Sequence, residues 1–298
     1  MKVLVTGKNG QLGSELQKSC PNNIELVCFG SQELDIANAE QVNELLISHS
    51  PDIVINAAAY TAVDKAETDV DAAYAVNQQG AANLANVCKH INAQLIHVST
   101  DFVFDGTSTL PYTANDETNP LGVYGASKLA GEQDINNILG GHATIVRTAW
   151  VYSVFGNNFV KTMLRLMNEK EQLGIVGDQV GTPTWADGLA NMLWALVNKN
   201  NNELQVNNAN TATILNWTDA GVASWYDFAV AIQELAIEQG LLSKAIPISA
   251  IPAASYPTPA KRPAFSVLNK AQAEELTGVK TIHWRTQLKT MLKELPNN

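Results

Sequence analysis

The sequence predicts an α/β protein, with a doubly wound parallel sheet followed by a smaller, mixed α/β C-terminal domain. Short apolar runs alternate with helical patterns up to residue 152, and a glycine-rich turn joins the first run to the first helix. The regularity loosens after Tyr152. Alternation of this kind is typical of a parallel sheet covered by helices on both faces. We expect a first domain at 1–152 and a second at 153–298, with a segment at about 176–208 returning to pack on the first.

The first half contains five apolar runs that end in turn residues and four helical patterns between them. Strands are predicted at 2–7, 24–30, 52–60, 93–100 and 143–152. Helices are predicted at 11–20, 37–50, 71–90 and 126–139, the last of them beginning near Tyr124.

The second half is mainly helical by its hydrophobic spacing. Helices are predicted at 157–170, 184–199, 224–240 and 284–295, with an Asn-rich loop at 198–204. The stretch AIPISAIPAASYPTPAKRP, at 245–263, has too many prolines for regular structure. Its length indicates a binding loop rather than a simple connection.

Composition excludes several classes of function. The chain has 298 residues, 46% of them hydrophobic, and a net charge of −10, which disfavours binding to nucleic acid. No apolar run approaches the roughly 20 residues that span a membrane, and no signal peptide is recognisable. Cys20, Cys28 and Cys88 lack metal-ligand spacing and indicate a reducing compartment. We expect a cytoplasmic protein.

The glycine-rich turn TGKNGQLG predicts a dinucleotide-binding site. Gly7, Gly10 and Gly13 lie between the first strand and the first helix, in a GxxGxxG variant of the usual spacing. Such glycines allow a tight turn and a close approach of the backbone to a pyrophosphate at the helix N-terminus. Three alanines, Ala57 to Ala59, end the third strand and would let a flat cofactor pass over the backbone.

The end of the second strand leaves the choice between NAD and NADP open. An acid here usually binds the adenosine ribose, but the chain has Gly30, Ser31 and Gln32 at these positions. No Arg that would favour NADP lies there either.

A Tyr, a Lys and a Thr form a candidate proton-transfer site. Tyr124 and Lys128 lie four residues apart and so share one helical face. An ammonium one turn away would lower the pKa of the phenol toward the working range of an acid catalyst. Thr100 ends the fourth strand, on the side of the sheet where ligands bind, and would hold the substrate oxygen.

These motifs together resemble the extended short-chain dehydrogenase/reductases and, among them, the dTDP-4-dehydrorhamnose reductase family. The resemblance runs from Met1 to about Leu268, through the segments GKNGQLGSEL, ELDIANAE, PDIVINAAAYTAVDKAE, STDFVFDG, YGASKLAGE, RTAWVY, GNNFVKTML, DQVGTPT and YPTPAKRPAFSVL. It implies a Rossmann-type first domain, a nucleotide-sugar substrate domain, and reduction of the C4 ketone of dTDP-4-dehydro-L-rhamnose by NADPH or NADH. The product, dTDP-L-rhamnose, is a precursor of cell-surface polysaccharide.

The resemblance also implies roles for individual residues. Tyr124 would donate a proton to the C4 oxygen, Lys128 would tune it and bind the nicotinamide ribose, and Thr100 would bind the reacting oxygen. The cofactor would lie against Gly7, Gly10, Gln11, Leu12, Gly13, Asp35, Ile36, Ala57, Ala58, Ala59, Tyr124 and Lys128. The substrate would contact Thr100, Asp101, Trp150 and Arg262. The resemblance is compatible with a homodimer. Some family members dimerise through Mg²⁺, but no position in this sequence specifies a Mg²⁺ site, so we expect no metal.

Two other functions remain open on the same fold. A nucleotide-sugar 4,6-dehydratase or C4-epimerase is one, but dehydratases commonly follow the Thr with Asp-Glu, and here Phe102 follows Asp101. A non-catalytic regulatory subunit, such as that of methionine adenosyltransferase, is the other, and the intact Thr, Tyr and Lys argue against it.

Several candidate side chains have a structural explanation beside the functional one. Trp150 is either a sugar-binding aromatic or a core residue, and Arg262 either a diphosphate ligand or a surface cation. Lys161 and Arg165 share a helical face and are interpreted as solvated charges. His97 alternates on a buried strand and is interpreted as a packed core histidine.

Overall fold

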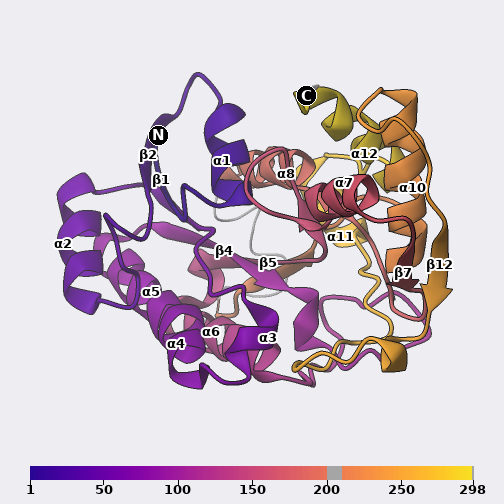
Figure 1. Cartoon of the computed structure of the whole chain (residues 1–298). Coiled ribbons are helices and arrows are strands. Elements are labelled where there is room, and N and C mark those ends of the chain that lie inside the picture. The colour runs from indigo at the N-terminus through magenta and orange to yellow at the C-terminus, as the bar shows by residue number, and fades with distance from the viewer. Residues whose placement is uncertain (200–209, 297–298) are drawn as a thin grey trace.

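A six-stranded parallel sheet forms the centre of the molecule. The computed structural model describes residues 1–199 and 210–296 (Figure 1). The strands are β1 (Lys2–Thr6), β2 (Glu25–Phe29), β3 (Ile53–Asn56), β4 (Gln94–Thr100), β5 (Ala143–Thr148) and β10 (Thr213–Asn216). Their order is β2-β1-β3-β4-β5-β10, and every neighbouring pair is parallel. The predicted doubly wound parallel sheet is therefore confirmed.

Helices bury both faces of this sheet, which explains why its strands are continuous apolar runs. One face packs against α1 (Gln11–Lys18), α8 (Ala186–Val197) and α11 (Ala271–Thr277). The other packs against α2 (Ala39–His49), α5 (Gly80–Ile91) and α6 (Val123–Leu139). Side chains alternate along β1: Val3 and Val5 belong to the first core and Leu4 to the second.

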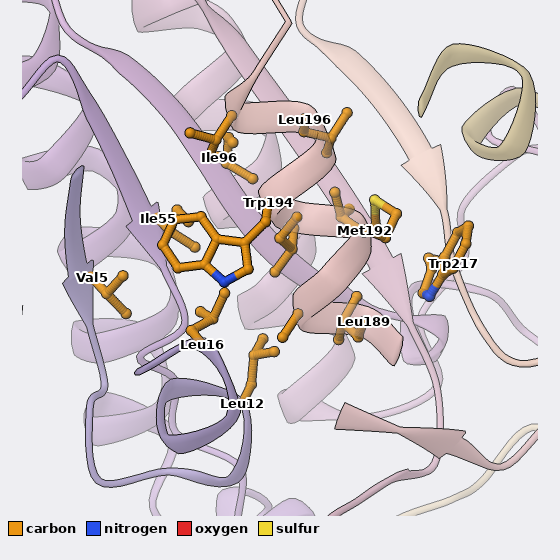
Figure 2. Close-up of a cluster of buried hydrophobic side chains, with 14 of the residues drawn as sticks. Val5, Leu12, Leu16, Ile55, Ile96, Leu189, Met192, Trp194, Leu196 and Trp217 are labelled. Atoms are coloured by element: carbon orange, nitrogen blue, oxygen red, sulfur yellow. The ribbon is translucent and has the colours of Figure 1, made fainter. Parts of the chain in front are cut away.

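Helix α8 ties the second half of the chain to the first. Figure 2 shows Trp194 of α8 among Leu16 of α1 and Ile55 of β3. Its side chain is buried, and its indole Nε1 donates to the Ser19 hydroxyl at 3.2 Å. The chain thus crosses back to the main sheet after residue 152 and later adds β10 to its edge. Residues 200–208 of the segment expected to return lie outside the described residues.

The C-terminal part has a separate core between α7 (Phe159–Glu169), α10 (Trp225–Glu238) and α12 (Trp284–Glu294) (Figure 1). Beside these helices, β7 (Leu173–Val176) pairs in parallel with β12 (Ile248–Ile251). Shorter pairs join β6 (Val151–Tyr152) to β9 (Thr184–Trp185) and β8 (Val180–Gly181) to β11 (Ala223–Ser224). The smaller, mixed α/β C-terminal part is confirmed.

Three predictions about individual elements were wrong or incomplete. The strand expected at 143–152 is broken into β5 and β6, because Trp150 adopts a left-handed backbone with φ +47°. The Pro-rich stretch is not wholly irregular: β12 fits between Pro247 and Pro252 because its backbone pairs with β7. The helix expected at 71–90 comprises α4 (Val70–Tyr74), a π-helical turn (Ala75–Gln79) and α5. Strand β10 and the short helix α3 (Val63–Ala66) were not expected.

No helix within the described part of the chain is both long and apolar enough to cross a bilayer.

Candidate active site

A cavity of about 730 Å³ lies at the carboxyl ends of β1, β3, β4 and β5. The strand order reverses between β1 and β3, and ligands of doubly wound sheets bind in the crevice at such a point. Most residues predicted to bind cofactor or substrate line this cavity: Gly7, Gly10, Gln11, Leu12, Asp35, Ile36, Ala57, Ala58, Ala59, Thr100, Asp101, Tyr124, Lys128 and Trp150. The structure thus brings together side chains that lie more than a hundred residues apart in the sequence.

The glycine-rich turn is shaped by two close backbone approaches. Gly7 has φ +74°, and a Cβ there would lie 2.8 Å from the backbone of Ala57. A Cβ on Gly13 would lie 2.2 Å from the Gly7 carbonyl oxygen. Gly13 therefore serves packing of α1 against the turn, since it does not line the cavity. Gly10 begins α1 without a side-chain cap, so the helix N-terminus faces the cavity through its backbone N–H groups.

An ion pair that was not predicted from the sequence lies beside the far end of the cavity, after β2. Gly30 and Ser31 line it, and the Gly30 N–H donates to Glu33 Oε2 at 2.7 Å. Lys8, from the glycine-rich turn, pairs with the other oxygen of this carboxylate. A cation and an acid thus lie beside the end of β2, although neither occupies the position that motif spacing would indicate.

Thr100 and Tyr124 meet where β4 ends and α6 begins. The Thr100 hydroxyl accepts from the Phe102 N–H at 3.2 Å, and the Tyr124 ring packs edge-on against Phe102, with centroids 5.5 Å apart. Burial raises the pKa of Tyr124 to about 12, the hydrogen bond with Thr100 lowers it, and the Asp101 charge raises it further. The expected lowering of this pKa by Lys128 does not hold in the protein alone, because desolvation dominates.

Lys128 is buried and held in place from β4. Its ammonium nitrogen Nζ donates to the Val98 carbonyl oxygen at 2.7 Å and lies 3.1 Å from Nε2 of His97. Burial lowers the pKa of Lys128 to about 8, while the charge of Glu132 opposes the shift. His97 is buried, as expected, but it also contacts this candidate catalytic residue, which its place on an alternating strand did not reveal.

Two further residues set the position of α6, and the sequence analysis missed both roles. The Val123 N–H at the start of α6 donates to Glu67 Oε1 at 2.8 Å, so a carboxylate from another segment caps the helix. A Cβ on Gly125 would lie 2.2 Å from the Phe102 carbonyl oxygen. The glycine inside YGASK therefore lets Tyr124 approach the end of β4.

Asp101 lies buried beside the Tyr124–Thr100 pair. The Thr100 hydroxyl donates to Asp101 Oδ1 at 3.1 Å. Burial raises the pKa of Asp101 to about 6, and hydrogen bonds with Ser266 and Thr100 act in the opposite direction. The carboxyl group can therefore change its charge near neutral pH within the site.

Trp150 forms one wall of the cavity in a strained backbone conformation. Its indole stacks on that of Trp225, with centroids 3.6 Å apart and planes 9° apart. Gly181 makes room for it, since a Cβ there would lie 2.8 Å from Trp150 Cε2. A left-handed non-glycine residue costs of order 1–3 kcal/mol, and Trp150 is the one of the three in the described residues that lines the cavity, since Ser50 and Asn92 are helix C-caps.

Arg262 is not brought to the cavity lining. Its guanidinium pairs with the Asp64 carboxylate through contacts of 3.0 and 2.8 Å, joining the Pro-rich stretch to α3. Of the other two cations, Arg165 forms an exposed pair with Glu169 at 2.8 Å. Lys161 instead donates to the Gly156 carbonyl oxygen at 2.9 Å and so steadies a loop that lines the cavity.

Residues 1–199 and 210–296 contain no group of three or more His, Cys, Asp or Glu side chains arranged to hold a metal ion.

Comparison with known proteins gives a consistent family. The model of the RmlD substrate binding domain matches residues 1–297. A dTDP-4-dehydrorhamnose reductase of Aggregatibacter actinomycetemcomitans is 40% identical over 292 residues, covering 97% of this chain and 98% of the relative. Among solved structures, the dTDP-4-dehydrorhamnose reductase of Clostridium acetobutylicum is 40% identical, with a TM-score of 0.88 over 98% of each chain.

A second solved structure is that of a dTDP-4-dehydrorhamnose reductase from Bacillus anthracis in complex with NADP. It is 33% identical, with a TM-score of 0.88 over 98% of this chain and 99% of that one. The family model matches residues 1–297, and the relative and both solved structures named here are dTDP-4-dehydrorhamnose reductases. The chain therefore belongs to the RmlD substrate-binding-domain family, that of the dTDP-4-dehydrorhamnose reductases.

Proposed function

We propose that this protein reduces the C4 ketone of dTDP-4-dehydro-L-rhamnose to dTDP-L-rhamnose with NADPH or NADH. The observation that carries the proposal is the meeting of Thr100, Tyr124 and Lys128 at one end of the cavity whose other end is the glycine-rich turn. Membership of the family supports the choice of substrate.

The turn and its surroundings fit a dinucleotide. Gly7 and Ala57 leave no room for a Cβ between them, and the uncapped N-terminus of α1 presents backbone N–H groups suited to a pyrophosphate. Ala57, Ala58 and Ala59 form a low wall along the cavity, and Asp35 and Ile36 line its adenine end. When bound, NAD(P)H supplies the hydride. Lys8 and Glu33 beside Gly30 offer a partner for either a 2′-phosphate or a ribose hydroxyl.

The chain's own residues carry the proton. Tyr124 is un-ionised at neutral pH, as a tyrosine of ordinary pKa would also be, so its hydroxyl carries the proton that the C4 oxygen receives. Thr100 holds the same oxygen through its hydroxyl. The Lys128 ammonium stabilises the phenolate that remains, and solvent returns the proton to Tyr124.

Trp150 and Asp101 shape the sugar end. The indole face of Trp150, backed by Trp225, offers an apolar surface for the sugar ring. Asp101 offers a buried oxygen for a sugar hydroxyl. Arg262 could reach a diphosphate only after leaving Asp64, so we assign it a structural role in the protein without substrate.

A dehydratase needs a second acid beside the Thr–Asp pair, and Phe102 stands there instead with its ring against Tyr124. The absence of a second acid at this position favours reduction of a ketone over elimination by a dehydratase. We place the protein in the cytoplasm, where nucleotide sugars and reduced cofactors are available, and make no assignment of its oligomeric state.

The test is a steady-state assay with dTDP-4-dehydrorhamnose and either NADH or NADPH, followed by absorbance of the reduced cofactor. We expect Tyr124→Phe to lower turnover by at least about 10²-fold, the lower end of general acid–base effects. Tyr74→Phe, a half-buried tyrosine on α4, should retain turnover. Near wild-type turnover in Tyr124→Phe would remove Tyr124 from the mechanism, and no turnover by the wild-type protein would refute the proposal.

A further inference from the structure

We propose that His97 is a positioning residue that destabilises the charged form of Lys128 and thereby sets the upper pH limit of carbonyl reduction. The inference rests on the proposed function for its kinetic consequence, but its structural basis does not. His97 lies on β4 with 1% of its surface exposed, and its two ring nitrogens contact Asn56 and Lys128.

The orientation of the Asn56 amide is fixed by its neighbours on β1 and β3. Oδ1 of Asn56 accepts from the Thr6 hydroxyl at 2.6 Å and from the Ala58 N–H at 3.1 Å. A backbone N–H can only donate, so the amide atom that faces Ala58 must be the oxygen. The amide nitrogen Nδ2 therefore faces Nδ1 of His97, at 2.9 Å.

This orientation selects one tautomer of His97. Since Nδ2 of Asn56 donates, Nδ1 of His97 must accept and carries no proton. A neutral imidazole has one N–H, which must then lie on Nε2. Nε2 is the atom 3.1 Å from Nζ of Lys128, so His97 presents a donor to the lysine nitrogen.

A donor at this point favours the neutral amine of Lys128. The amine has a lone pair that can accept from Nε2–H, whereas an ammonium has three donors and no acceptor. Lys128 cannot simply turn away, because Nζ also donates to the Val98 carbonyl oxygen at 2.7 Å. To accommodate the ammonium, His97 must change tautomer and lose its hydrogen bond from Asn56. The lowered pKa values of Lys128 and His97 agree in direction with this geometry.

Other ionisable groups face Lys128 from the elements around it. Glu132, one turn further along α6, favours the ammonium, although its charge is shared with Arg147 of β5 at 2.7 Å. Tyr124 lies one turn before Lys128, and Asp101 follows β4. His97 is thus the side chain in direct contact with Nζ that opposes the charge.

The consequence for catalysis is an alkaline limit. The ammonium stabilises the Tyr124 phenolate left by proton donation, so reduction slows as Lys128 loses its proton to solvent with rising pH. A group in contact with Nζ that accepts a hydrogen bond would extend reduction to higher pH.

His97→Gln tests this. A glutamine amide reaches the position of Nε2 and can present its carbonyl oxygen to the ammonium, so the alkaline limb of the kcat profile should move upward by about one to two pH units, the worth of a charge-assisted hydrogen bond. His90→Gln, at an exposed position on α5, makes the same exchange and should leave the limb in place. An unmoved or downward-shifted limb in His97→Gln would overturn the inference.

A second measurement does not depend on activity. In protein labelled with ¹⁵N-histidine, the His97 ring, assigned through its own backbone, should show an unprotonated Nδ1 and a protonated Nε2. In protein labelled at lysine Cε, the signal lost in Lys128→Met should titrate at higher pH in His97→Gln than in the wild type. A proton on Nδ1, or equal titration in the two proteins, contradicts the role of His97 even if the wild type is an active reductase. If the wild-type protein shows the predicted His97 tautomer but no turnover, only the proposed function is refuted. If His97→Gln does not fold, the tautomer can still be measured in the wild-type protein.

Discussion

The buried carboxyl of Asp101 makes stability depend on pH in the direction opposite to that of a typical salt-bridged aspartate. Its pKa is raised to about 6 in the folded protein, whereas an unfolded aspartate titrates near 3.9. Between these values the folded state binds the proton more tightly, so the contribution of Asp101 to the free energy of unfolding is highest at low pH. It falls as pH rises from about 4, and the loss is complete once pH has passed the folded pKa.

The expected magnitude follows from the two pKa values. A difference of about two units corresponds to roughly 3 kcal/mol at pH 8 relative to the fully protonated state. About half of this, roughly 1–1.5 kcal/mol, is lost between pH 5 and pH 8, since the unfolded carboxyl is already mostly ionised at pH 5. Asp101→Asn removes the titration while keeping an oxygen for the Thr100 hydroxyl.

Urea unfolding followed by tryptophan fluorescence at pH 5 and pH 8 measures the effect. Asp101→Asn should gain roughly 1–1.5 kcal/mol relative to the wild type as pH is raised over this interval. Asp71→Asn, on the exposed surface of α4, supplies the control for removing one carboxylate. If wild type and Asp101→Asn show the same pH dependence, Asp101 is not a buried titrating group and the reasoning fails.

Two further variants test the packing of the site. Gly7→Ala should weaken NADPH binding at least tenfold, because the new Cβ would lie 2.8 Å from the Ala57 backbone. Gly240 has nearly the same φ, +76°, but open space around it, so Gly240→Ala should leave the affinity for NADPH unchanged. Isothermal titration with NADPH measures both variants. Glu132→Gln should lower the free energy of unfolding by roughly 3 kcal/mol or more, because it leaves the Arg147 guanidinium buried without a counter-charge. Glu169→Gln, in the exposed pair with Arg165, should lower it by less than about 1 kcal/mol. Equal losses of the two variants in urea unfolding would contradict this.

The sequence predicted the main sheet well because its signals are local. Strands β1, β3, β4 and β5 are largely buried on both faces and the edge strand β2 is partly buried, so each appears as a mainly apolar run between turn residues. Strand β10 was missed because it has only four residues and, among residues 1–199 and 210–296, pairs along one side alone, with β5. Strand β12 was hidden by flanking prolines, since its pairing with β7 depends on a partner some seventy residues earlier.

Most of the residues that the motifs singled out line one cavity, because motif spacing determines their geometry. A Tyr and a Lys four residues apart in a helix share one face whatever surrounds them. A glycine-rich turn between a first strand and a first helix is typical of dinucleotide binding. The net direction of the Tyr124 pKa was predicted wrongly, because the pKa is raised by desolvation and desolvation depends on burial by the rest of the fold. Three contacts join segments that are distant in the sequence, so no local pattern predicts them. They are the contacts of Arg262 with Asp64, of Glu67 with Val123 and of His97 with Asn56.

The crossing of the chain between the two cores limits how this protein can be recombined with its relatives. A breakpoint at Tyr152 would separate the first sheet from α8, whose Trp194 fills one of its faces (Figure 2), and from its edge strand β10. The part after Tyr152 therefore could not be exchanged as one piece, because it would also carry side chains that pack on the six-stranded sheet and the edge strand of that sheet. A productive chimera would have to exchange α7, α10 and α12 and leave α8, α11 and β10 with the parent sheet.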